Sequence, residues 1–374
     1  MKKEITLLLT GGHVTPAIAT IEEIRSRFPG WKLIFVGRKH SLEGKNILSE
    51  EYRLIHELGI PFFPITAGRL KRDGGLSAVT ALGKIPIGFV QAMLTVVRVR
   101  PAVIVTFGGY VALPVAMSAK LFGIPVVTHE QTTRPGLANR LIARIATRTC
   151  VSFPETKTML GDDVVLTGLP LRRAVLTKSP QKPFDVPDDK PILFVVGGST
   201  GSVSVNAAVF AALPVLLQTY IVVHQVGRLS EQTSQTAADK LTKKLADHYI
   251  HRAYFSAVEY SWAMHNSSIV IGRSGANTVM EIALAAKTAI CIPLPWAAEN
   301  EQFHNAVVLT RGGSVILPQD ELTAESLIRT VNEVYDSREE RSRKAKELSG
   351  AIPKDGAKRF VDVIEHILSP KTNT

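Results

Sequence analysis

Three glycine turns, each following an apolar run, are the first places in this 374-residue sequence where chemistry could occur. They are Gly11-Gly12, Gly108-Gly109 and residues 197–201, which read Gly-Gly-Ser-Thr-Gly. Glycine lets the backbone turn sharply and approach a ligand closely. A helix that follows such a turn presents unpaired N–H groups and its positive end to an anion. Three turns of this kind predict a cleft that handles phosphate.

A fourth turn, residues 273–281, reads Arg-Ser-Gly-Ala-Asn-Thr-Val-Met-Glu and follows another apolar run. Ser274 and the amides of residues 275–278 can point toward a ligand at the start of the predicted helix. Glu281 lies one turn further on, where a carboxylate can accept two hydrogen bonds from a ribose diol. The same carboxylate could simply complement the helix dipole. On the residues alone both interpretations stay open.

Several classes of protein are disfavoured by what the turns lack. None has the acidic residue about 20 positions on that marks dinucleotide-binding sites, and none has a Walker A lysine. The sequence has no Asp-x-Asp motif, since its Asp pairs are Asp162-Asp163 and Asp188-Asp189. Cys150 and Cys291 both lie in apolar runs, which fits a reducing compartment rather than disulfides or zinc. We therefore expect neither a cofactor nor a metal.

The spacing of apolar runs predicts an α/β protein built from two doubly wound parallel sheets. Strands are expected at 5–9, 32–36, 102–106 and 124–128, and the pattern restarts at 192–196 after a proline- and charge-rich stretch. Two Rossmann-like domains facing a cleft are the simplest arrangement. Their predicted bounds are 1–167 and 191–350, with a linker at 168–190 and a C-terminal helical segment at 351–374 that could pack back on the first domain.

The net charge of +11 belongs to the N-terminal part of the chain. Residues 1–150 hold 20 Lys and Arg against 9 Asp and Glu, whereas residues 151–374 hold 24 of each. Nucleic acid, an anionic membrane or a phosphate-bearing acceptor would each explain this asymmetry, as would an ordinary solvated surface. The basic part has no recognisable nucleic-acid-reading module, so we expect no nucleic-acid partner.

The first apolar run, residues 5–9, is too short for the core of a signal peptide and is interpreted as a strand. No stretch reaches the roughly 18–20 apolar residues of a membrane span. Residues 85–97 are apolar and lie between the cations of 69–72 and 84 and those of 98 and 100. This pattern fits peripheral docking on an anionic membrane, and equally a buried helix with cationic ends.

Eight segments, in order along the chain, resemble one known family. They are 11–16 (Gly-Gly-His-Val-Thr-Pro), 107–111 (Phe-Gly-Gly-Tyr-Val), 129–131 (His-Glu-Gln), Gly136 with Asn139, 168–172 (Gly-Leu-Pro-Leu-Arg), 197–201, 273–281 and 301–306 (Glu-Gln-Phe-His-Asn-Ala). Together they resemble the MurG family, UDP-N-acetylglucosamine transferases that complete lipid II in peptidoglycan synthesis. The resemblance runs from about residue 5 to 320.

The resemblance implies a GT-B fold whose first domain binds a polyprenyl-pyrophosphate-linked acceptor and whose second domain binds UDP-GlcNAc. It also implies a peripheral enzyme on the cytoplasmic face of the cell membrane. For the donor it implies that Glu281 holds the ribose hydroxyls, that Ser199 and Arg172 meet the diphosphate and that Gln302 reads the GlcNAc hydroxyls. Further implied donor contacts are Ala276, Asn277 and Thr278 along the phosphate and ribose, and the backbone of Phe255 and Ser256 at uracil. The implied acceptor contacts are Gly11, Gly12, Thr15, Gly108, Gly109, Tyr110, His129, Glu130, Gln131, Thr132 and Asn139.

His13 matches the general base that is proposed in this family. A hydroxyl is a poor nucleophile, and an imidazole with a reference pKa of about 6.5 is suited to take its proton. We therefore predict inverting, metal-independent displacement of UDP by an acceptor hydroxyl, with His13 as the base. A histidine that only caps the loop or binds acceptor phosphate is the alternative.

The sequence departs from the family pattern at several positions. Leu8 and Leu9 replace the first two glycines of the first loop, and Thr132, Leu169, Thr200 and Glu301 replace Asn, Asn, Gln and Gln. Three alternative functions therefore stay open. They are transfer to another lipid acceptor such as a diacylglycerol or a different polyprenyl-linked sugar, a nonhydrolysing UDP-GlcNAc epimerase, and a sugar-nucleotide-binding protein without turnover.

Overall fold

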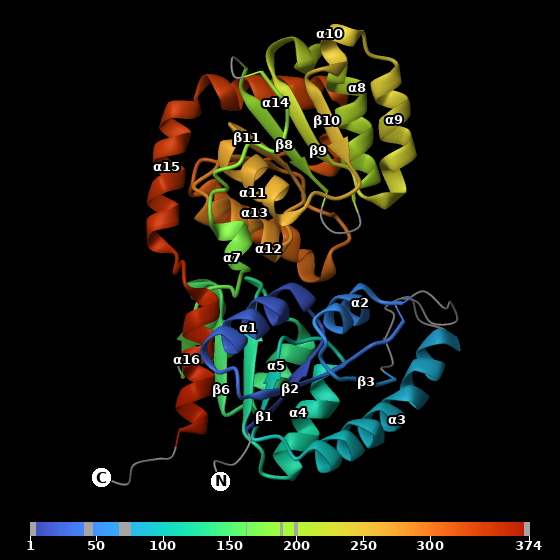
Figure 1. Cartoon of the computed structure of the whole chain (residues 1–374), viewed down its shortest axis with the longest axis vertical. Coiled ribbons are helices and arrows are strands. Elements are labelled where there is room, and N and C mark those ends of the chain that lie inside the picture. The colour runs from blue at the N-terminus through green and yellow to red at the C-terminus, as the bar shows by residue number, and fades with distance from the viewer. Residues whose placement is uncertain are drawn as a thin grey trace. The chain divides into compact units, whose positions relative to one another are not determined.

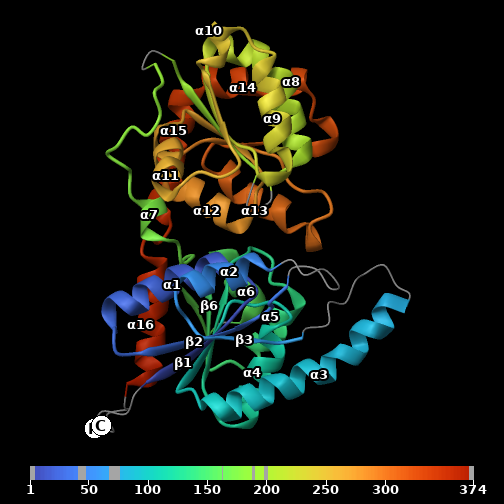
Figure 2. The same cartoon turned by 45° about the vertical axis from the view of Figure 1, so that its right-hand side comes forward.

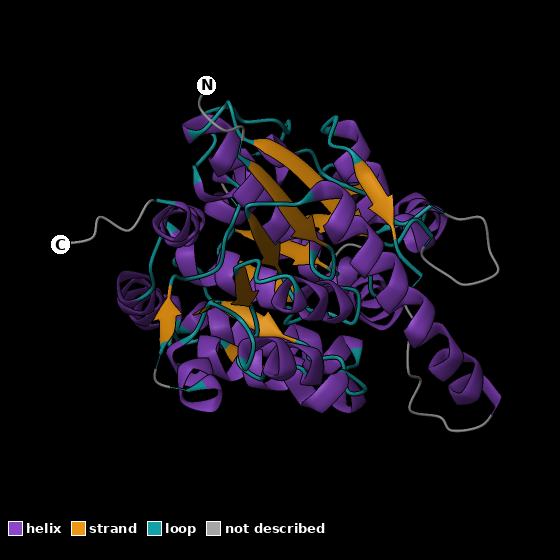
Figure 3. Cartoon of the chain, turned by 90° about the horizontal axis from the view of Figure 1, so that it is seen from below, coloured by secondary structure: helices purple, strands orange, loops and turns teal. Residues whose placement is uncertain are grey.

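The computed structural model describes residues 5–40, 48–66, 76–161, 163–187, 190–197 and 201–369, with the backbone alone at 76–85 and 298. Its contacts divide the chain into two units, shown in Figures 1 and 2. The first comprises residues 1–172 with 355–374, and the second comprises residues 173–354. The predicted linker, 168–190, is divided between them. Strands (orange in Figure 3) lie inside, and helices (purple) lie outside.

The first unit contains a seven-stranded sheet in the order β3-β2-β1-β4-β5-β6-β7, with every pair parallel. Its strands are β1 (Thr6–Thr10), β2 (Lys32–Gly37), β3 (Phe62–Pro64), β4 (Val103–Thr106), β5 (Val126–Glu130), β6 (Arg148–Val151) and β7 (Val164–Leu166). Its helices are α1 (Val14–Arg27), α2 (Glu50–Glu57), α3 (Leu76–Val99), α4 (Ala112–Leu121), α5 (Leu137–Ala143), α6 (Pro154–Leu160) and α16 (Gly356–Leu368).

Strand β1 shows why its apolar run is continuous. Side chains alternate between the faces of a sheet, and both faces of this sheet are covered. Leu7 and Leu9 belong to one buried cluster with α1 and α16. Leu8 belongs to the other, with α3, α4 and α5. All three leucines are fully buried, so the prediction of a doubly wound sheet is confirmed for this unit.

The second unit repeats the architecture with a six-stranded parallel sheet in the order β10-β9-β8-β11-β12-β13. Its strands are β8 (Ile192–Val196), β9 (Ile221–Gln225), β10 (Tyr249–Arg252), β11 (Ile269–Gly272), β12 (Ala289–Cys291) and β13 (Val315–Ile316). Its α-helices are α7 (Arg173–Leu176), α8 (Val203–Thr219), α9 (Glu231–Asp239), α10 (Lys243–Ala246), α11 (Ala257–Asn266), α12 (Ala276–Leu284), α13 (Glu301–Thr310), α14 (Ala324–Asp336) and α15 (Arg338–Ala351). Three short 3-10 helices are η1 (Arg228–Ser230), η2 (Ala298–Asn300) and η3 (Gln319–Glu321).

Helix α16 lies beside α1 in the first unit, although more than 300 residues of chain separate the two (Figure 1). The Arg27 guanidinium donates hydrogen bonds to Asp362 (2.6 Å) and Glu365 (2.7 Å) on α16. The Phe360 ring is fully buried against the rings of Phe107 and His129, with centroid distances of 5.6 and 5.1 Å. The last helix therefore completes the core of the first unit beneath two of its predicted site loops.

Replacing Phe360 with Ala should destabilise the first unit by about 3–5 kcal/mol, because it removes a fully buried ring and leaves a cavity. The measurement is hydrogen exchange of peptides that cover β1 and β4, which reports on this unit by itself. The control is Lys358→Ala, an exposed change on the same helix, which should leave exchange as in the wild type. Equal protection in both variants would contradict the role of α16 in this core.

Candidate functional site

The loops after β1 and β4 meet at the carboxyl edge of the first sheet through bare backbone. A Cβ atom at Gly12 would lie 2.1 Å from the Gly108 carbonyl oxygen, and one at Gly108 would lie 2.5 Å from the Asn139 amide nitrogen. Gly12, Gly108 and Gly109 have φ values of 137°, 79° and 80°, which side chains disfavour. Four predicted acceptor residues therefore lie in one place, and their glycines are required there.

His13 occupies the N-cap position of α1, at the end of this glycine turn, and its side chain makes no capping hydrogen bond. The side chain is half-buried. Burial lowers the pKa of the His13 imidazole to about 4. The ring is therefore neutral at pH 7 and can accept a proton, but the lowered pKa makes it a weaker base than an ordinary imidazole. Thr15, in the first turn of the same helix, is also half-buried.

His129 ends up deeper in the unit than His13. Its Nε2 lies 3.0 Å from the Gly168 carbonyl oxygen, so Nε2–H donates and Nδ1 is left as an acceptor. Within the described residues Nδ1 has no hydrogen-bond partner. Burial, together with the nearby charge of His13, lowers the pKa of His129 to about 4, against the Gly168 hydrogen bond that raises it. Protonation of His13 would therefore disfavour protonation of His129.

Glu130 is buried and held by three uncharged donors. Its Oε1 accepts from the backbone N–H and the hydroxyl of Thr132, both at 2.8 Å, and its Oε2 accepts from the Asn139 amide at 2.5 Å. Burial raises the pKa of the Glu130 carboxyl, and these hydrogen bonds oppose the rise. Thr132 therefore fits its position well, although the family pattern has Asn there.

Five buried polar atoms of the first unit have no hydrogen-bond partner within the described chain. Buried polar atoms are nearly always paired, so a cluster of unpaired atoms marks a place that a ligand or water completes. All five belong to residues at or beside the carboxyl ends of β1, β2 and β5 or to the helices that follow these strands. They are Thr10 Oγ1, Glu51 Oε1, His129 Nδ1, Gln131 Oε1 and Asn139 Oδ1. Thr10 and Glu51 were not predicted from the sequence.

Tyr110 follows the glycine turn after β4, and Arg172 follows β7, the last strand of the sheet. The half-buried Tyr110 ring has the Arg38 guanidinium over it, 5.1 Å from the ring centroid. Arg172, the last residue of this stretch of the first unit, donates from Nε to Glu22 on α1 at 2.9 Å. Both side chains of that ion pair are well exposed, so it is weak and leaves Arg172 available to a phosphate.

In the second unit, α12 begins in the manner that the motif predicts. Gly275 is the N-cap, with φ −63° and ψ 150°, and it has no side chain to satisfy the first N–H groups of the helix. Ser274 is fully buried, and its Oγ has no partner within the described residues; the same is true of Asn277 Oδ1. Ala276 is buried and Thr278 half-buried beside them. The helix start therefore combines free N–H groups with unpaired side-chain oxygens.

Glu281 is buried one turn further along α12, where the Tyr260 hydroxyl donates to its Oε2 at 2.6 Å. Burial raises the pKa of Glu281 to about 7, and the Tyr260 hydrogen bond opposes the rise. Near neutral pH this carboxyl is therefore present both as the carboxylate, which only accepts hydrogen bonds, and as the neutral acid, which can also donate one. Tyr260, which keeps one oxygen engaged, was not predicted from the sequence.

Arg273 opens the motif but is fully engaged within the second unit. Its guanidinium donates to Ser202 Oγ (3.0 Å), Ser204 Oγ (2.9 Å), Gln319 Oε1 (2.5 Å) and the carbonyls of Ile292 (3.0 Å) and Pro293 (3.2 Å). These partners follow β8 and β12 or lie on η3. Arg273 therefore holds the site loops together and has no donor left for a phosphate.

The loop that leads into α13 is backbone-strained. Glu299 and Asn300 both have positive φ, 51° and 54°, which non-glycine residues seldom adopt. Gln302 Oε1 accepts from the Leu294 N–H at 3.1 Å and closes this loop. The amide nitrogen of Gln302 remains for a ligand. Asn305 donates to the Ser274 carbonyl at 3.3 Å, which links α13 to the α12 turn.

The backbone N–H groups of Phe255 and Ser256 already have partners. Phe255 N–H donates to Gln225 Oε1 at 3.1 Å, and Ser256 N–H donates to Glu259 Oε2 at 2.8 Å within a capping box. The Ser256 carbonyl accepts from the Tyr260 N–H at 2.9 Å, so the Phe255 carbonyl oxygen is the group that remains for a base. Ser199, the remaining predicted donor contact, lies outside the described residues.

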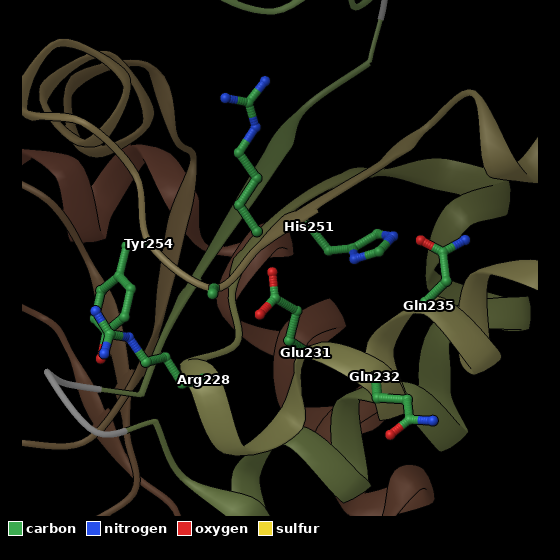
Figure 4. A pocket seen from close by; sticks show the side chains of 8 residues that line it. Arg228, Glu231, Gln232, Gln235, His251 and Tyr254 are labelled. Atoms are coloured by element: carbon green, nitrogen blue, oxygen red, sulfur yellow. The ribbon is translucent and has the colours of Figure 1, made fainter.

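A hollow of about 730 Å³ opens at the carboxyl ends of β9 and β10 (Figure 4). Tyr254 lines it and is the residue before Phe255 in the sequence. The Arg228 guanidinium lies over the Tyr254 ring, 5.5 Å from its centroid. None of the lining residues was predicted as a site residue; they are Arg228, Glu231, Gln232, Gln235, His251, Arg252, Ala253 and Tyr254. Among the described residues no group of His, Cys, Asp and Glu could hold a metal ion.

Comparison with known proteins decides the family. Two family models match in succession, the glycosyltransferase family 28 N-terminal domain over residues 10–151 and the C-terminal domain over residues 192–360. A Clostridium botulinum protein named UDP-N-acetylglucosamine–N-acetylmuramyl-(pentapeptide) pyrophosphoryl-undecaprenol N-acetylglucosamine transferase is 33% identical over 340 residues, which are 88% of this chain and 89% of that protein. The chain belongs to the MurG family.

Solved structures agree with this MurG-family assignment at the level of the fold. Acinetobacter baumannii MurG superposes with a TM-score of 0.73 at 24% identity, over 97% of this chain and all of that one. A Neisseria meningitidis UDP-GlcNAc 2-epimerase superposes with a TM-score of 0.63 at 11% identity, over 97% of this chain and all of that one. The prediction of a GT-B glycosyltransferase of the MurG family is confirmed, and the likeness to epimerases extends to the fold alone.

Replacing Glu281 with Gln should change how stability depends on pH. A carboxyl whose pKa rises on folding, here from 4.5 to about 7, stabilises the folded state fully below pH 4.5, and that contribution is lost as pH rises through 7. Gln does not titrate, so the second unit of the variant should gain stability relative to the wild type across this window. The measurement is hydrogen exchange of α12 peptides between pH 4.5 and 8. A pH-independent difference between the two proteins would contradict the buried-acid assignment.

Proposed function

We propose that this enzyme transfers GlcNAc from UDP-GlcNAc to a muramyl-peptide carried on a polyprenyl pyrophosphate, the step that converts lipid I to lipid II. The main support is the 33% identity to a relative that bears this activity in its name, sustained over 88% of the chain. The site geometry agrees with it in both units. One departure from the family pattern, Thr132, is accommodated by its two hydrogen bonds to Glu130.

The donor binds the second unit in this proposal. The start of α12, with its unpaired Ser274 Oγ and Asn277 Oδ1, meets the phosphate and ribose. Glu281 takes the ribose diol through the oxygen that Tyr260 leaves free. Gln302 reads GlcNAc hydroxyls through its amide nitrogen, and the backbone at Phe255 and Ser256 binds uracil, with the Phe255 carbonyl as the acceptor. Ser199 and Arg172 complete the contacts to the diphosphate.

The acceptor binds at the carboxyl edge of the first unit. The glycine turns bring backbone N–H groups close to its pyrophosphate, and the free atoms of His129, Gln131 and Asn139 supply acceptors for its hydroxyl and amide groups. His13 lies at the centre of this edge. Tyr110 and Thr15 border it.

In the reaction, the acceptor hydroxyl attacks the anomeric carbon of GlcNAc from the face opposite to UDP. The new C–O bond forms as the bond from that carbon to the β-phosphate oxygen breaks, and UDP leaves with the electron pair. The hydroxyl proton passes to the neutral imidazole of His13. Helix-start N–H groups and Arg172 stabilise the charge on UDP, without a metal. The lack of an Asp-x-Asp motif in the sequence supports this.

We also propose that α3 and α4 dock the enzyme on the cytoplasmic face of an anionic membrane. Ala92 and Val96 bury one face of α3, yet its opposite face is apolar and exposed rather than polar. Exposed cations lie close to these helix ends: Arg98 and Arg100 at the end of α3, and Lys120 near the end of α4. Within the described residues no helix is long and apolar enough to span a bilayer. The exposed apolar residues are Ile87, Val90, Leu94 and Val97 on α3, and Met117, Leu121 and Phe122 on or just after α4. The predicted cations at 69–72 lie outside the described residues.

Replacing His13 with Ala should lower kcat for GlcNAc transfer by about 10²–10⁴-fold, the usual contribution of a general base. The affinity for UDP-GlcNAc, measured by calorimetry, should stay as in the wild type. The control is His366→Ala, an exposed histidine on α16. A raised acceptor KM with a small loss of kcat would show that His13 positions the acceptor instead. Product formation without any acceptor would identify an epimerase.

Replacing Leu94, which is 62% exposed, with Glu should weaken binding to vesicles of anionic phospholipid by roughly tenfold or more, because it places a charge in the apolar face. Leu229→Glu, at an exposed position of the second unit, is the matched control. Co-sedimentation at low salt is the measurement. Equal binding of the two variants, or no binding by the wild type, would remove the membrane proposal and leave the transfer reaction untouched.

A further inference from the structure

Helix α2 is fixed against the end of β2 by its cap. Ser49 Oγ accepts from the Tyr52 N–H at 3.0 Å and donates to the Arg38 carbonyl at 2.5 Å. The Ser49 N–H donates to the Lys39 carbonyl at 2.9 Å. Glu51, in the first turn of α2, is therefore held at the same sheet edge as the glycine turn that carries His13.

The Glu51 carboxyl occupies the space that two missing side chains would fill. A Cβ atom at Gly11 would lie 1.3 Å from Glu51 Oε1, and one at Gly37 would lie 2.6 Å from it. Neither glycine has a positive φ, so backbone conformation does not require glycine at either position. Instead, a side chain at either position would displace the Glu51 carboxyl from the place it occupies.

The Glu51 carboxyl has few hydrogen-bond partners in this position. Its Oε2 accepts one long hydrogen bond, 3.4 Å, from the Arg38 N–H. Its Oε1 is buried and has no partner within the described part of the chain. Burial raises the pKa of Glu51 to about 7, against the lowering effect of the Arg38 N–H and charge. A buried oxygen without a partner destabilises the fold, which points to a functional reason for keeping it.

Gly11 continues directly into Gly12 and His13. The turn is confined on one side by Glu51 against Gly11 and on the other by the Gly108 carbonyl, which Gly12 meets closely. The Glu51 carboxyl therefore lies directly against the turn that leads to His13 and the start of α1.

We propose that Glu51 is a positioning residue for transfer: its carboxyl, wedged between Gly11 and Gly37, sets the Gly11–His13 turn so that the His13 imidazole meets the acceptor hydroxyl. This inference rests on the proposed function, because Glu51 acts through His13. The neutral acid is the form that fits, since an ionised carboxylate here would be buried with one oxygen unpaired. The titratable groups on the surrounding elements are Arg38, Lys39 and His40 after β2, Glu50 and Tyr52 on α2, and His13 after β1.

Glu51→Ala should lower kcat by about 10–100-fold, the scale expected when a catalytic group is misplaced by around an ångström. The affinity for UDP-GlcNAc should not change. Glu51→Gln, which copies the neutral acid, should keep kcat near the wild-type value at pH 6. Wild-type kcat should fall as pH rises through 7, because Glu51 ionises, and the Gln variant should lack this fall. Glu50→Gln, an exposed neighbour on the same helix turn, is the matched control.

A Gln variant whose pH profile follows the wild type, or an Ala variant with unchanged kcat, would overturn the inference while leaving the proposed function intact. If the wild type transfers nothing to a muramyl acceptor, the proposed function fails, and the inference is then tested by NMR titration of the His13 ring. The chemical shifts of the His13 ring should change in the wild type as pH rises through 7, because Glu51 ionises there, and should not change in Glu51→Gln. Identical His13 spectra across that range would refute the coupling of Glu51 to the turn.

Discussion

The close approach of Gly12 to the Gly108 carbonyl is the constraint on which the site of the first unit depends. A parallel sheet delivers the loops after β1 and β4 to one edge, but it does not make them touch. A Cβ atom at Gly12 would lie 2.1 Å from the Gly108 carbonyl oxygen, so no side chain fits between the two loops. The loops therefore meet through backbone atoms, and their N–H groups lie at the same edge as the start of α1. The position of His13 follows from that contact, since it is the next residue along the chain.

Buried acids that are held by uncharged donors recur in both units. Glu130 is held by Thr132 and Asn139, Glu281 by Tyr260, and Glu51 by a backbone N–H. Burial raises the pKa of all three, and those of Glu51 and Glu281 to about 7. A carboxyl near its pKa can accept a hydrogen bond or donate one. Such groups suit a sugar or a ribose, whose hydroxyls both donate and accept, better than a permanently charged carboxylate would.

The sequence predicts what depends on local pattern. Continuous apolar runs identify β1, β2, β4, β5 and β8, though not β3, β6, β7 or β10, and the glycine turns and the 273–281 segment identify loops at the carboxyl edges of the sheets. It does not predict partners that are distant along the chain. Tyr260 is an ordinary aromatic until the fold places it 2.6 Å from Glu281, and Glu51 is one acid among several in a charged helix until it fills the space at Gly11. The packing of Phe360 under Phe107 depends likewise on tertiary structure.

Arg273 shows that an arginine in a helix-start motif need not bind a phosphate. An arginine at the head of a helix-start motif looks like a phosphate ligand, yet its guanidinium donates five hydrogen bonds within the second unit. Those bonds keep the loops after β8, β11 and β12 in register, and they leave backbone N–H groups and small polar side chains as the unpaired polar groups at the start of α12. In the proposed reaction, the charge on departing UDP is therefore met at this helix mainly by dipoles that are already oriented. Fixed dipoles need no reorganisation as the charge develops, which is the condition under which they stabilise a transition state more than a mobile solvent does.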